Sequence, residues 1–359
     1  MPSKRAPARC AKSSEVVASP GVAGVELAST SVRVVVGHRE QARFRVTGVG
    51  HASLAMGAVS GGYVADRRAV VAAIVAAFAG AERAGRAERV VVAIDGDDIR
   101  TFHDSTTFER TDQRDAVSPG EAVRAIRVAR EAAARIARDQ ASDDPALRGI
   151  ATAELRDDVS GFVLDGRRLG SPVGDRGRQL EVRTDIALAP LVQAGGATAA
   201  LEAAKRRATA TSGAYALARL VAESGVSEAG IARVGADVTA VAVVRDGRVA
   251  GTRVFAVGRD VLTSRHGTAD ADVWARCVVA TVRSLGLELP GKWYAAGIPD
   301  DLAGLPRALG SVAGVERGGS VEVLPLRTSL VPRIVADASL SADDLVAAGA
   351  AALGAEAYA

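Results

Sequence analysis

The sequence is poor in aromatic residues, cysteine and histidine. Aromatic side chains make up only 3% of its 359 residues, so the core must be built mainly from valine, alanine and leucine. The two cysteines, Cys10 and Cys277, argue against a disulfide framework and are typical of a reducing compartment. The four histidines show no metal-ligand spacing, so no metal site is expected.

The sequence also lacks a strong charge of one sign and a long apolar run. Its 45 basic and 42 acidic residues give a net charge of +3, which is no reason to expect nucleic-acid binding. The longest apolar run, residues 69–81, is too short to cross a bilayer, and the N-terminus has no apolar signal segment. Hydrophobic residues at 48% and charged residues at 24% predict a globular chain, long enough for two domains.

Two stretches of the chain contain the same β-hairpin unit. Residues 231–258 consist of an apolar strand, a turn of small residues, a valine-rich strand, a polar turn and a return strand. Residues 24–50 repeat this order. Asp246-Gly247 predicts a type I′ turn, because that turn needs positive φ at both central residues. A unit duplicated at this distance predicts two related domains that face each other.

Capping residues predict where several helices begin. Asp66 is expected to cap one helix, and Ser341 a terminal helix that ends at Gly354. Two more helices are expected at about residues 197–208 and 212–223.

The helix expected from Ser118 to about residue 138 has the clearest signal. Ser118 and Glu121 form a capping-box pattern. The helical period places Val123, Ile126 and Ala133 on the buried face. Its arginine-rich face is expected to be solvated, with partner binding as the alternative.

Each hairpin unit carries small and hydroxyl residues around its first turn. These are Ser29 and Thr30 in the first unit, and Gly235 and Thr239 in the second. Backbone N–H groups and hydroxyls from two such turns can bind phosphates from both sides. Hydrolysis also needs carboxylates that hold Mg²⁺ and position water, and Glu26 precedes the first turn.

The order of these motifs resembles that of the actin-like ATPases, and within them the branch of the division protein FtsA and the pilus protein PilM. Residues 25–33 look like the first phosphate loop and residues 233–247 like the second. Residues 90–102 and 164–186 are similar to the two ends of a small subdomain inserted in FtsA. Gly297 stands where the adenosine loop belongs. Each motif is degenerate, so the specificity of the resemblance lies in their order.

The resemblance implies an α/β, actin-like (ribonuclease H-like) fold of two domains, with duplicated β-hairpin units and a small inserted α+β subdomain of the SHS2 type. The implied division of the chain is a disordered basic tail at 1–20, domain I at 21–87 with about 183–228 and 333–359, the insert at 88–182, and a shortened domain II at 229–332. The implied nucleotide-binding residues are Glu26, Ser29, Thr30, Gly235, Thr239 and Gly297.

The departures from the family pattern concern the phosphate loops. Arg233 stands where the second loop opens with an acidic residue, and Asp237 lies inside that loop. Ala28 and Ala236 stand where the family has glycine. An aspartate in a phosphate loop repels the ligand, and an added β-carbon can narrow the loop. These changes predict lost ATP hydrolysis, and either no cofactor or weakly bound ATP or ADP with Mg²⁺.

The resemblance thus implies a pseudo-ATPase that acts as a cytoplasmic adaptor or scaffold at the inner membrane. Its implied partners are the cytoplasmic tail of a membrane protein or components of pilus, secretion or division machinery, met at the groove between the insert and domain I. Self-association and the choice between pilus and division stay open. The alternative is an active ATPase that uses Glu26 and Asp237 as Mg²⁺ ligands. A sugar or acetate kinase relative would need a substrate-binding acid, and the cluster of Asp95, Asp97 and Asp98 is expected to be a solvated turn.

Overall fold

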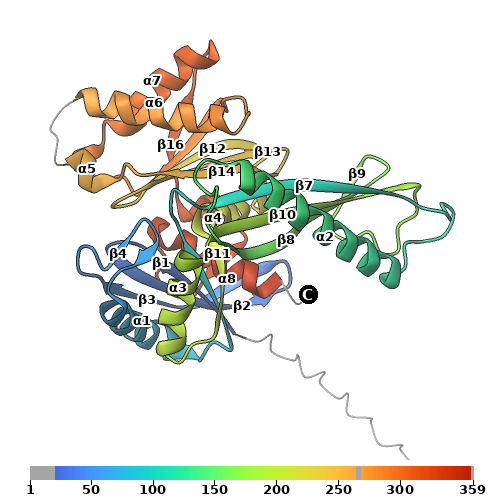
Figure 1. Cartoon of the computed structure of the whole chain (residues 1–359), viewed down its shortest axis with the longest axis horizontal. Helices are drawn as coiled ribbons and strands as arrows, with labels where there is room; N and C mark the ends of the chain where they lie inside the picture. The colour runs from blue at the N-terminus through green and yellow to red at the C-terminus, as the bar shows by residue number, and fades with distance from the viewer. Residues whose placement is uncertain (1–20, 264–267, 357–359) are drawn as a thin grey trace, which may run out of the picture.

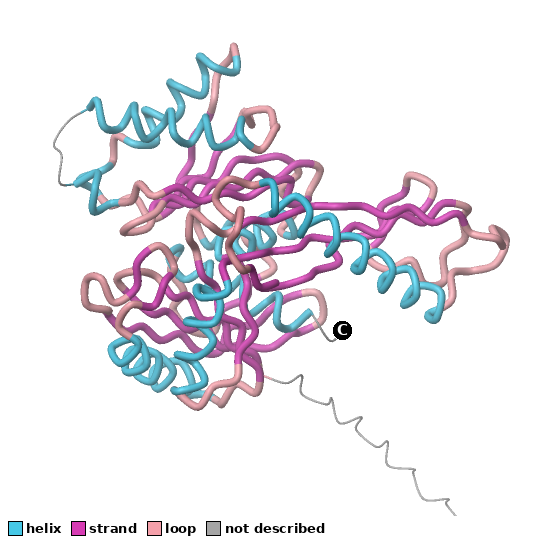
Figure 2. The backbone as a smooth tube through the Cα atoms, in the orientation of Figure 1, coloured by secondary structure: helices cyan, strands magenta, loops and turns pink. Residues whose placement is uncertain are grey.

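Two β-sheets of the same topology form the body of the molecule, and a third sheet extends from it as an arm (Figures 1 and 2). The computed structural model describes residues 21–263 and 268–356. The expected disordered tail at residues 1–20 lies outside these described residues. Within them, every helix is too short or too polar to span a lipid bilayer.

The first sheet has the strand order β11-β6-β1-β2-β3-β17. Its strands are β1 (Val22–Leu27), β2 (Ser31–Glu40), β3 (Arg43–Ser53), β6 (Arg89–Ile94), β11 (Ala208–Ser212) and β17 (Ile334–Ala336). Strands β1, β2 and β3 form an antiparallel meander, and β6 joins β1 in parallel. Parts of the meander alternate apolar and polar residues, a pattern that favours half-buried strands. Other parts are continuous apolar runs, which favour fully buried strands.

The second sheet repeats this arrangement in the order β14-β13-β12-β15-β16. Its strands are β12 (Glu228–Val234), β13 (Thr239–Arg245), β14 (Arg248–Phe255), β15 (Lys292–Ala296) and β16 (Glu322–Pro325). Strands β12, β13 and β14 form the second meander, and β15 joins β12 in parallel as β6 joins β1. Asp246 and Gly247 have φ of 56° and 66°, as a type I′ turn requires. The predicted duplication is confirmed.

Helices cover the outer faces of both sheets, and two helices fill the space between them. The helices of the body are α1 (Arg67–Ala81), α3 (Leu191–Ala203), α4 (Gly213–Glu223), α5 (Arg259–Thr263), α6 (Thr268–Ser284), α7 (Leu305–Arg317) and α8 (Leu345–Glu356). Helices α4 and α8 share one core with Val91 of the first sheet and Ile231 of the second. Helices α6 and α7 pack on the second sheet around Trp274 and Trp293, which are fully buried.

Close approach of backbones explains why small residues dominate the core. A β-carbon on Gly24 of β1 would lie 1.9 Å from the Ala347 carbonyl oxygen of α8. One on Gly50 of β3 would lie 1.9 Å from the Ala77 carbonyl oxygen of α1. These helices therefore pack on the sheet at distances that exclude larger side chains.

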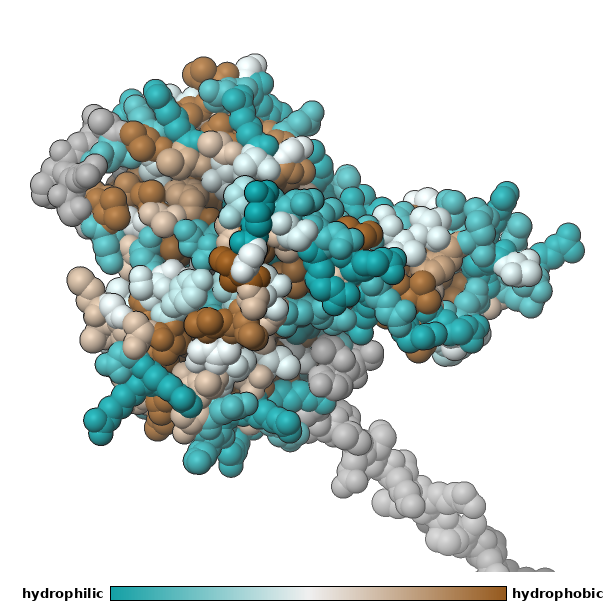
Figure 3. Space-filling model, in the orientation of Figure 1, coloured by the Kyte–Doolittle hydropathy of each residue, from teal (hydrophilic) through white to brown (hydrophobic). Residues whose placement is uncertain are grey.

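The arm is a four-stranded sheet with the order β7-β10-β8-β9, covered by helix α2. Its elements are β7 (Arg100–Glu109), α2 (Pro119–Asp143), β8 (Thr152–Leu164), β9 (Arg167–Leu169) and β10 (Gln179–Pro190). Figure 3 shows mostly hydrophilic side chains on its visible face. Residues 89–94, before the arm, pair within the first sheet, and β10 pairs with β7 and β8 along most of its length.

Helix α2 confirms the predicted N-cap and, in part, the predicted buried face. Ser118 accepts a hydrogen bond from the Glu121 N–H at 3.2 Å, while the Glu121 carboxylate binds Arg110 and does not close the capping box. The buried positions are alanines throughout: Ala122, Ala125, Ala129, Ala133, Ala137 and Ala141. Of the residues expected on the buried face, Ala133 is buried and Ile126 packs partly buried on the arm's core, whereas Val123 is 65% exposed.

Three other expectations need correction. The helix expected at 197–208 is α3, which ends at Ala203 and is followed by β11, a short strand that was not predicted. Residues 334–336 form β17 and are not irregular. Ser341 does cap the terminal helix, through a capping box with Asp344, but Gly354 lies inside α8 and does not end it.

Candidate functional site

The first turns of the two hairpin units face each other across the gap between the sheets. Residues 28–30 connect β1 to β2, and residues 235–238 connect β12 to β13. Both turns are closed by backbone hydrogen bonds, from the Ala28 N–H to the Ser31 oxygen at 3.0 Å and from the Gly235 N–H to the Val238 oxygen at 2.8 Å. The same small cavity touches both turns, so the structure brings them together as predicted.

A buried cation joins the two sheets at this point. The Arg233 guanidinium, at the end of β12, donates a hydrogen bond to the carboxylate of Glu26, at the end of β1. Its other terminal nitrogen lies 3.9 Å from an oxygen of Asp95, just after β6. The three side chains are only 13%, 4% and 12% exposed. Pairing of this kind is what allows charged groups to be buried.

A carboxylate from the second turn binds donors of the first sheet. Asp237 accepts a hydrogen bond from the Ser29 hydroxyl at 2.8 Å. It also accepts one from the backbone N–H of Gly61 at 2.7 Å, in the hairpin of β4 (Val59–Ser60) and β5 (Tyr63–Val64). A hydroxyl and a backbone amide are also the donors that hold a phosphate in proteins. In this chain they bind an internal carboxylate.

These contacts leave almost no free space between the turns. The cavity that borders Glu26, Ser29, Arg233 and Asp237 has a volume of about 30 Å³. A second cavity on the Thr30 side of the turns has about 20 Å³. Small-molecule sites span roughly 300–1,000 Å³. The phosphates of a nucleoside triphosphate would therefore have to displace the side chains of Arg233 and Asp237.

Electrostatics favour the ionised form of Arg233. Burial works to lower the pKa of Arg233, but the Glu26 and Asp95 carboxylates outweigh it, and the pKa lies above its ordinary value. Burial raises the pKa of Asp95 to about 6, although Arg233 and the Ala214 N–H, at 2.8 Å, both oppose the rise. The cleft thus holds a permanent cation beside a carboxyl group that titrates near neutrality.

The remaining predicted site residues lie around this cluster. Thr30 accepts a backbone hydrogen bond from Leu54 and borders the smaller cavity. The Thr239 hydroxyl donates to the Val257 oxygen at 2.6 Å and accepts from the Trp274 indole at 3.1 Å, inside the second domain's core. It therefore points away from the turns and takes no part in the cluster.

Gly297 follows β15 and needs to be glycine for a backbone reason. Its φ is 68°, in the left-handed region. A β-carbon there would lie 2.3 Å from the Val234 carbonyl oxygen, so the loop approaches the end of β12 closely. Gly297 touches both the smaller cavity beside the turns and a larger pocket.

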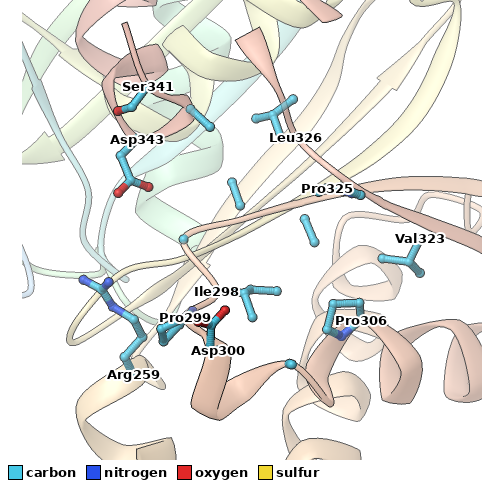
Figure 4. A pocket seen from close by; sticks show the side chains of 15 residues that line it. Arg259, Ile298, Pro299, Asp300, Pro306, Val323, Pro325, Leu326, Ser341 and Asp343 are labelled. Carbon is cyan, nitrogen blue, oxygen red and sulfur yellow. The ribbon is translucent and has the colours of Figure 1, made fainter. Parts of the chain in front are cut away.

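This larger pocket has a volume of about 600 Å³ and lies where the resemblance places adenosine (Figure 4). Its wall is apolar, with Ile298 and Pro299 from the loop after β15 and Leu326 from the segment after β16. Asp300 and Asp343 lie at its polar edge, and neither is a phosphate ligand. The adenosine side of the fold is therefore open while the phosphate side is filled.

Sequence reasoning missed three participants in the cluster. Asp95 was expected in a solvated turn, but it is largely buried against Arg233. Gly61 supplies its amide to Asp237, and Gln193, fully buried on α3, donates to the Gly61 oxygen at 2.5 Å. The position of Asp95 directly after β6, beside β1, was the available signal, since the ends of parallel strands meet at one edge of a sheet.

The cluster does not fit Mg²⁺ with ATP. Arg233 already neutralises Glu26 and Asp95, the acids nearest a metal position, and Asp237 would face the phosphates with like charge. Within the described residues, no three of the side chains of His, Cys, Asp and Glu are grouped so that they could hold a metal ion.

No protein-family model matches the sequence, and no curated protein sequence matches it. Among solved structures, a chain of the PilM-PilN type IV pilus biogenesis complex is similar over 93% of this chain and 98% of that chain, with a TM-score of 0.54 and 17% identity. This likeness shows the fold alone. With the duplicated topology, it confirms the predicted actin-like ATPase fold.

Two further solved structures are similar at lower scores. The ethanolamine utilization protein EutJ from Carboxydothermus hydrogenoformans is 14% identical over 93% of this chain and 89% of that chain, with a TM-score of 0.46. The cytoplasmic domain of EpsL, an inner membrane component of the type II secretion system of Vibrio cholerae, is 13% identical over 92% and 94%, with a TM-score of 0.40.

Proposed function

We propose that this chain is an actin-like adaptor of the FtsA and PilM branch, without ATP hydrolysis, that binds the cytoplasmic tail of an inner-membrane protein in pilus or secretion assembly. The observation that carries the proposal is the filled phosphate cleft. Arg233 and Asp237 occupy it with paired charges, and about 30 Å³ remains between the turns. A cleft that cannot admit the triphosphate leaves the chain a role as a scaffold for other proteins.

The arm supports the choice of branch. Along the chain its elements are β7, α2, β8, the three-residue β9 and β10; apart from β9, this is the order strand, helix, strand, strand that names an SHS2 subdomain. We therefore take the first sheet with α1, α3, α4 and α8 as domain I, the arm as the SHS2-type insert, and the second sheet with α5, α6 and α7 as a shortened domain II. The likeness to a chain of a PilM-PilN complex favours pilus assembly over division.

The groove between the arm and domain I is the partner site in this proposal. It has a volume of about 590 Å³. It lies between β8 of the arm and the start of β11, which is the edge strand of domain I's sheet. Four acidic and four arginine side chains line it around an apolar floor that includes Leu155 and Val91. An extended peptide with apolar and charged side chains suits such a lining, and an edge strand can add it through main-chain hydrogen bonds.

Calorimetry with Mg-ATP tests the loss of nucleotide binding. The wild type is expected to give no heat of binding at millimolar ATP, because Arg233 and Asp237 fill the cleft. An Arg233→Asp variant restores the acidic residue of the family pattern, so binding in the variant alone would assign the block to Arg233. Binding by the wild type that is lost on Glu26→Ala would overturn the proposal and favour an active ATPase.

Sedimentation with inner-membrane vesicles tests the partner site. The protein is expected to bind native vesicles but not vesicles shaved with protease or made of lipid alone. Thr209→Trp, which fills the groove without a change of charge, is expected to abolish binding. Val315→Trp on α7, where Val315 is 80% exposed and outside the groove, is the matched control and should bind normally. Equal binding to shaved vesicles would refute a protein tail as the partner.

A further inference from the structure

The two phosphate turns are held together by side chains of the chain itself. Arg233 and Asp237 both belong to the second domain, and their partners Glu26, Ser29 and Gly61 all belong to the first. These pairs are 207, 208 and 176 residues apart in sequence. Every one of these contacts therefore crosses the cleft.

The charges lie in the order that a cation and a phosphate would need. A guanidinium lies between two carboxylates, and a carboxylate is held by a hydroxyl and a backbone amide. We propose that Arg233 and Asp237 form an internal substitute for a bound ligand, which keeps the cleft closed without nucleotide. We name this set of contacts, made by Arg233 and Asp237, the clamp.

The surroundings hold both halves of the clamp in place. Gln193 donates to the carbonyl oxygen of Gly61, the residue whose N–H binds Asp237, and so helps to hold this residue in place. Glu26 is 3% exposed, and its second oxygen has no hydrogen-bond partner within the described residues. If Arg233 left, Glu26 would be a buried charge without a counter-ion. The guanidinium is therefore held in the cleft by the charge that it neutralises.

A second set of contacts, away from the turns, joins domain II to the arm. The Thr252 hydroxyl of β14 donates to Thr101 of β7 at 2.9 Å, and Arg253 lies 3.4 Å from Asp144 after α2. Helices α4 and α8 also share a core with both sheets. Loss of the clamp is therefore expected to open the cleft about these contacts without separating the domains.

Distances between two spin labels across the cleft, measured without nucleotide, test the clamp. The labels are placed at Met56→Cys, which is 90% exposed in the loop before β4, and at Asp272→Cys on α6. Both native cysteines are replaced by serine. The wild type is expected to give one narrow distance distribution. Asp237→Ala is expected to shift it to longer distances and to broaden it.

Three further measurements decide the result. Ser29→Ala removes one donor and keeps every charge, so it should give a smaller shift if Asp237→Ala does not fold. Millimolar guanidinium should return Arg233→Ala to the narrow distribution, because the free cation can pair with Glu26. Arg283→Ala removes an exposed pair with Glu316 inside domain II and should change nothing.

An unchanged distribution in Ser29→Ala and Arg233→Ala would overturn the clamp, as would a shift in Arg283→Ala of the same size. The proposed adaptor role is tested by other readouts, ATP heat and vesicle binding. A closed cleft that still binds ATP would refute the adaptor role and leave the clamp standing. An open cleft that binds no ATP would refute the clamp and leave the adaptor role standing.

Discussion

Removal of the Arg233 side chain is the sharpest stability test of this structure. Arg233→Ala leaves Glu26, 3% exposed, and Asp95 without the cation that neutralises them. Breaking a buried ion pair on one side costs about 3–5 kcal/mol, because the remaining charge is left in a poorly solvated place. At about pH 8 we therefore expect the free energy of unfolding to fall by an amount in that range.

The loss is expected to depend on pH in one direction. Without Arg233, the pKa of Asp95 rises further, because burial raises it and Arg233 opposes that rise. A group whose folded pKa is raised adds stability below its unfolded pKa and loses it as the pH rises through the folded value. The cost of Arg233→Ala should therefore be smaller at about pH 5 than at about pH 8.

Urea unfolding followed by circular dichroism at the two pH values measures this cost. Arg245→Ala is the control, since Arg245 lies 3.7 Å from Glu288, which is 91% exposed, and such a pair contributes less than about 1 kcal/mol. A cost for Arg233→Ala below about 1 kcal/mol at pH 8, or an equal cost at both pH values, would refute the reasoning.

Three further predictions concern single positions. Burial raises the pKa of Asp95 to about 6 against an unfolded value of 3.8, so its contribution to stability is lost as the pH rises through about 6; Asp95→Asn should remove about 3 kcal/mol of this pH dependence in urea unfolding. Gly297→Ala, with φ of 68° and a β-carbon 2.3 Å from the Val234 oxygen, should cost about 1–3 kcal/mol and lower the Tm. Ala129→Leu on the buried face of α2 should cost about 1–3 kcal/mol in thermal unfolding, whereas Val123→Ala on its exposed face should cost less than about 0.5 kcal/mol.

The sequence predicted the features that depend on local signals. Asp246-Gly247 marks a turn by its need for positive φ, and Ser118 marks a helix start by its side-chain acceptor. The duplicated hairpin units could be recognised because their order of strands and turns repeats. These units predicted two related domains that face each other, and the family resemblance implied the actin-like fold; the structure has the duplicated sheets and brings the two turns together.

The contacts inside the cleft could not be predicted in the same way. Arg233 was identified as a departure from the family pattern, but its pairing with Glu26 joins residues 207 positions apart. Asp95 was assigned to a solvated turn because sequence alone does not show that β6 ends beside β1. The buried face of α2 was predicted only in part, because the hydrophobic period included the exposed Val123, whereas the buried positions of this helix are alanines.

The placement of the two tryptophans has a consequence for spectroscopy. Trp274 and Trp293 are the sequence's only tryptophans, and both are buried in the core of the second sheet and α6. Tryptophan fluorescence, excited at the red edge of the indole absorption band, therefore reports on domain II alone. Circular dichroism reports on the whole chain. A difference between the two unfolding curves would show directly that the halves of the molecule melt in separate steps.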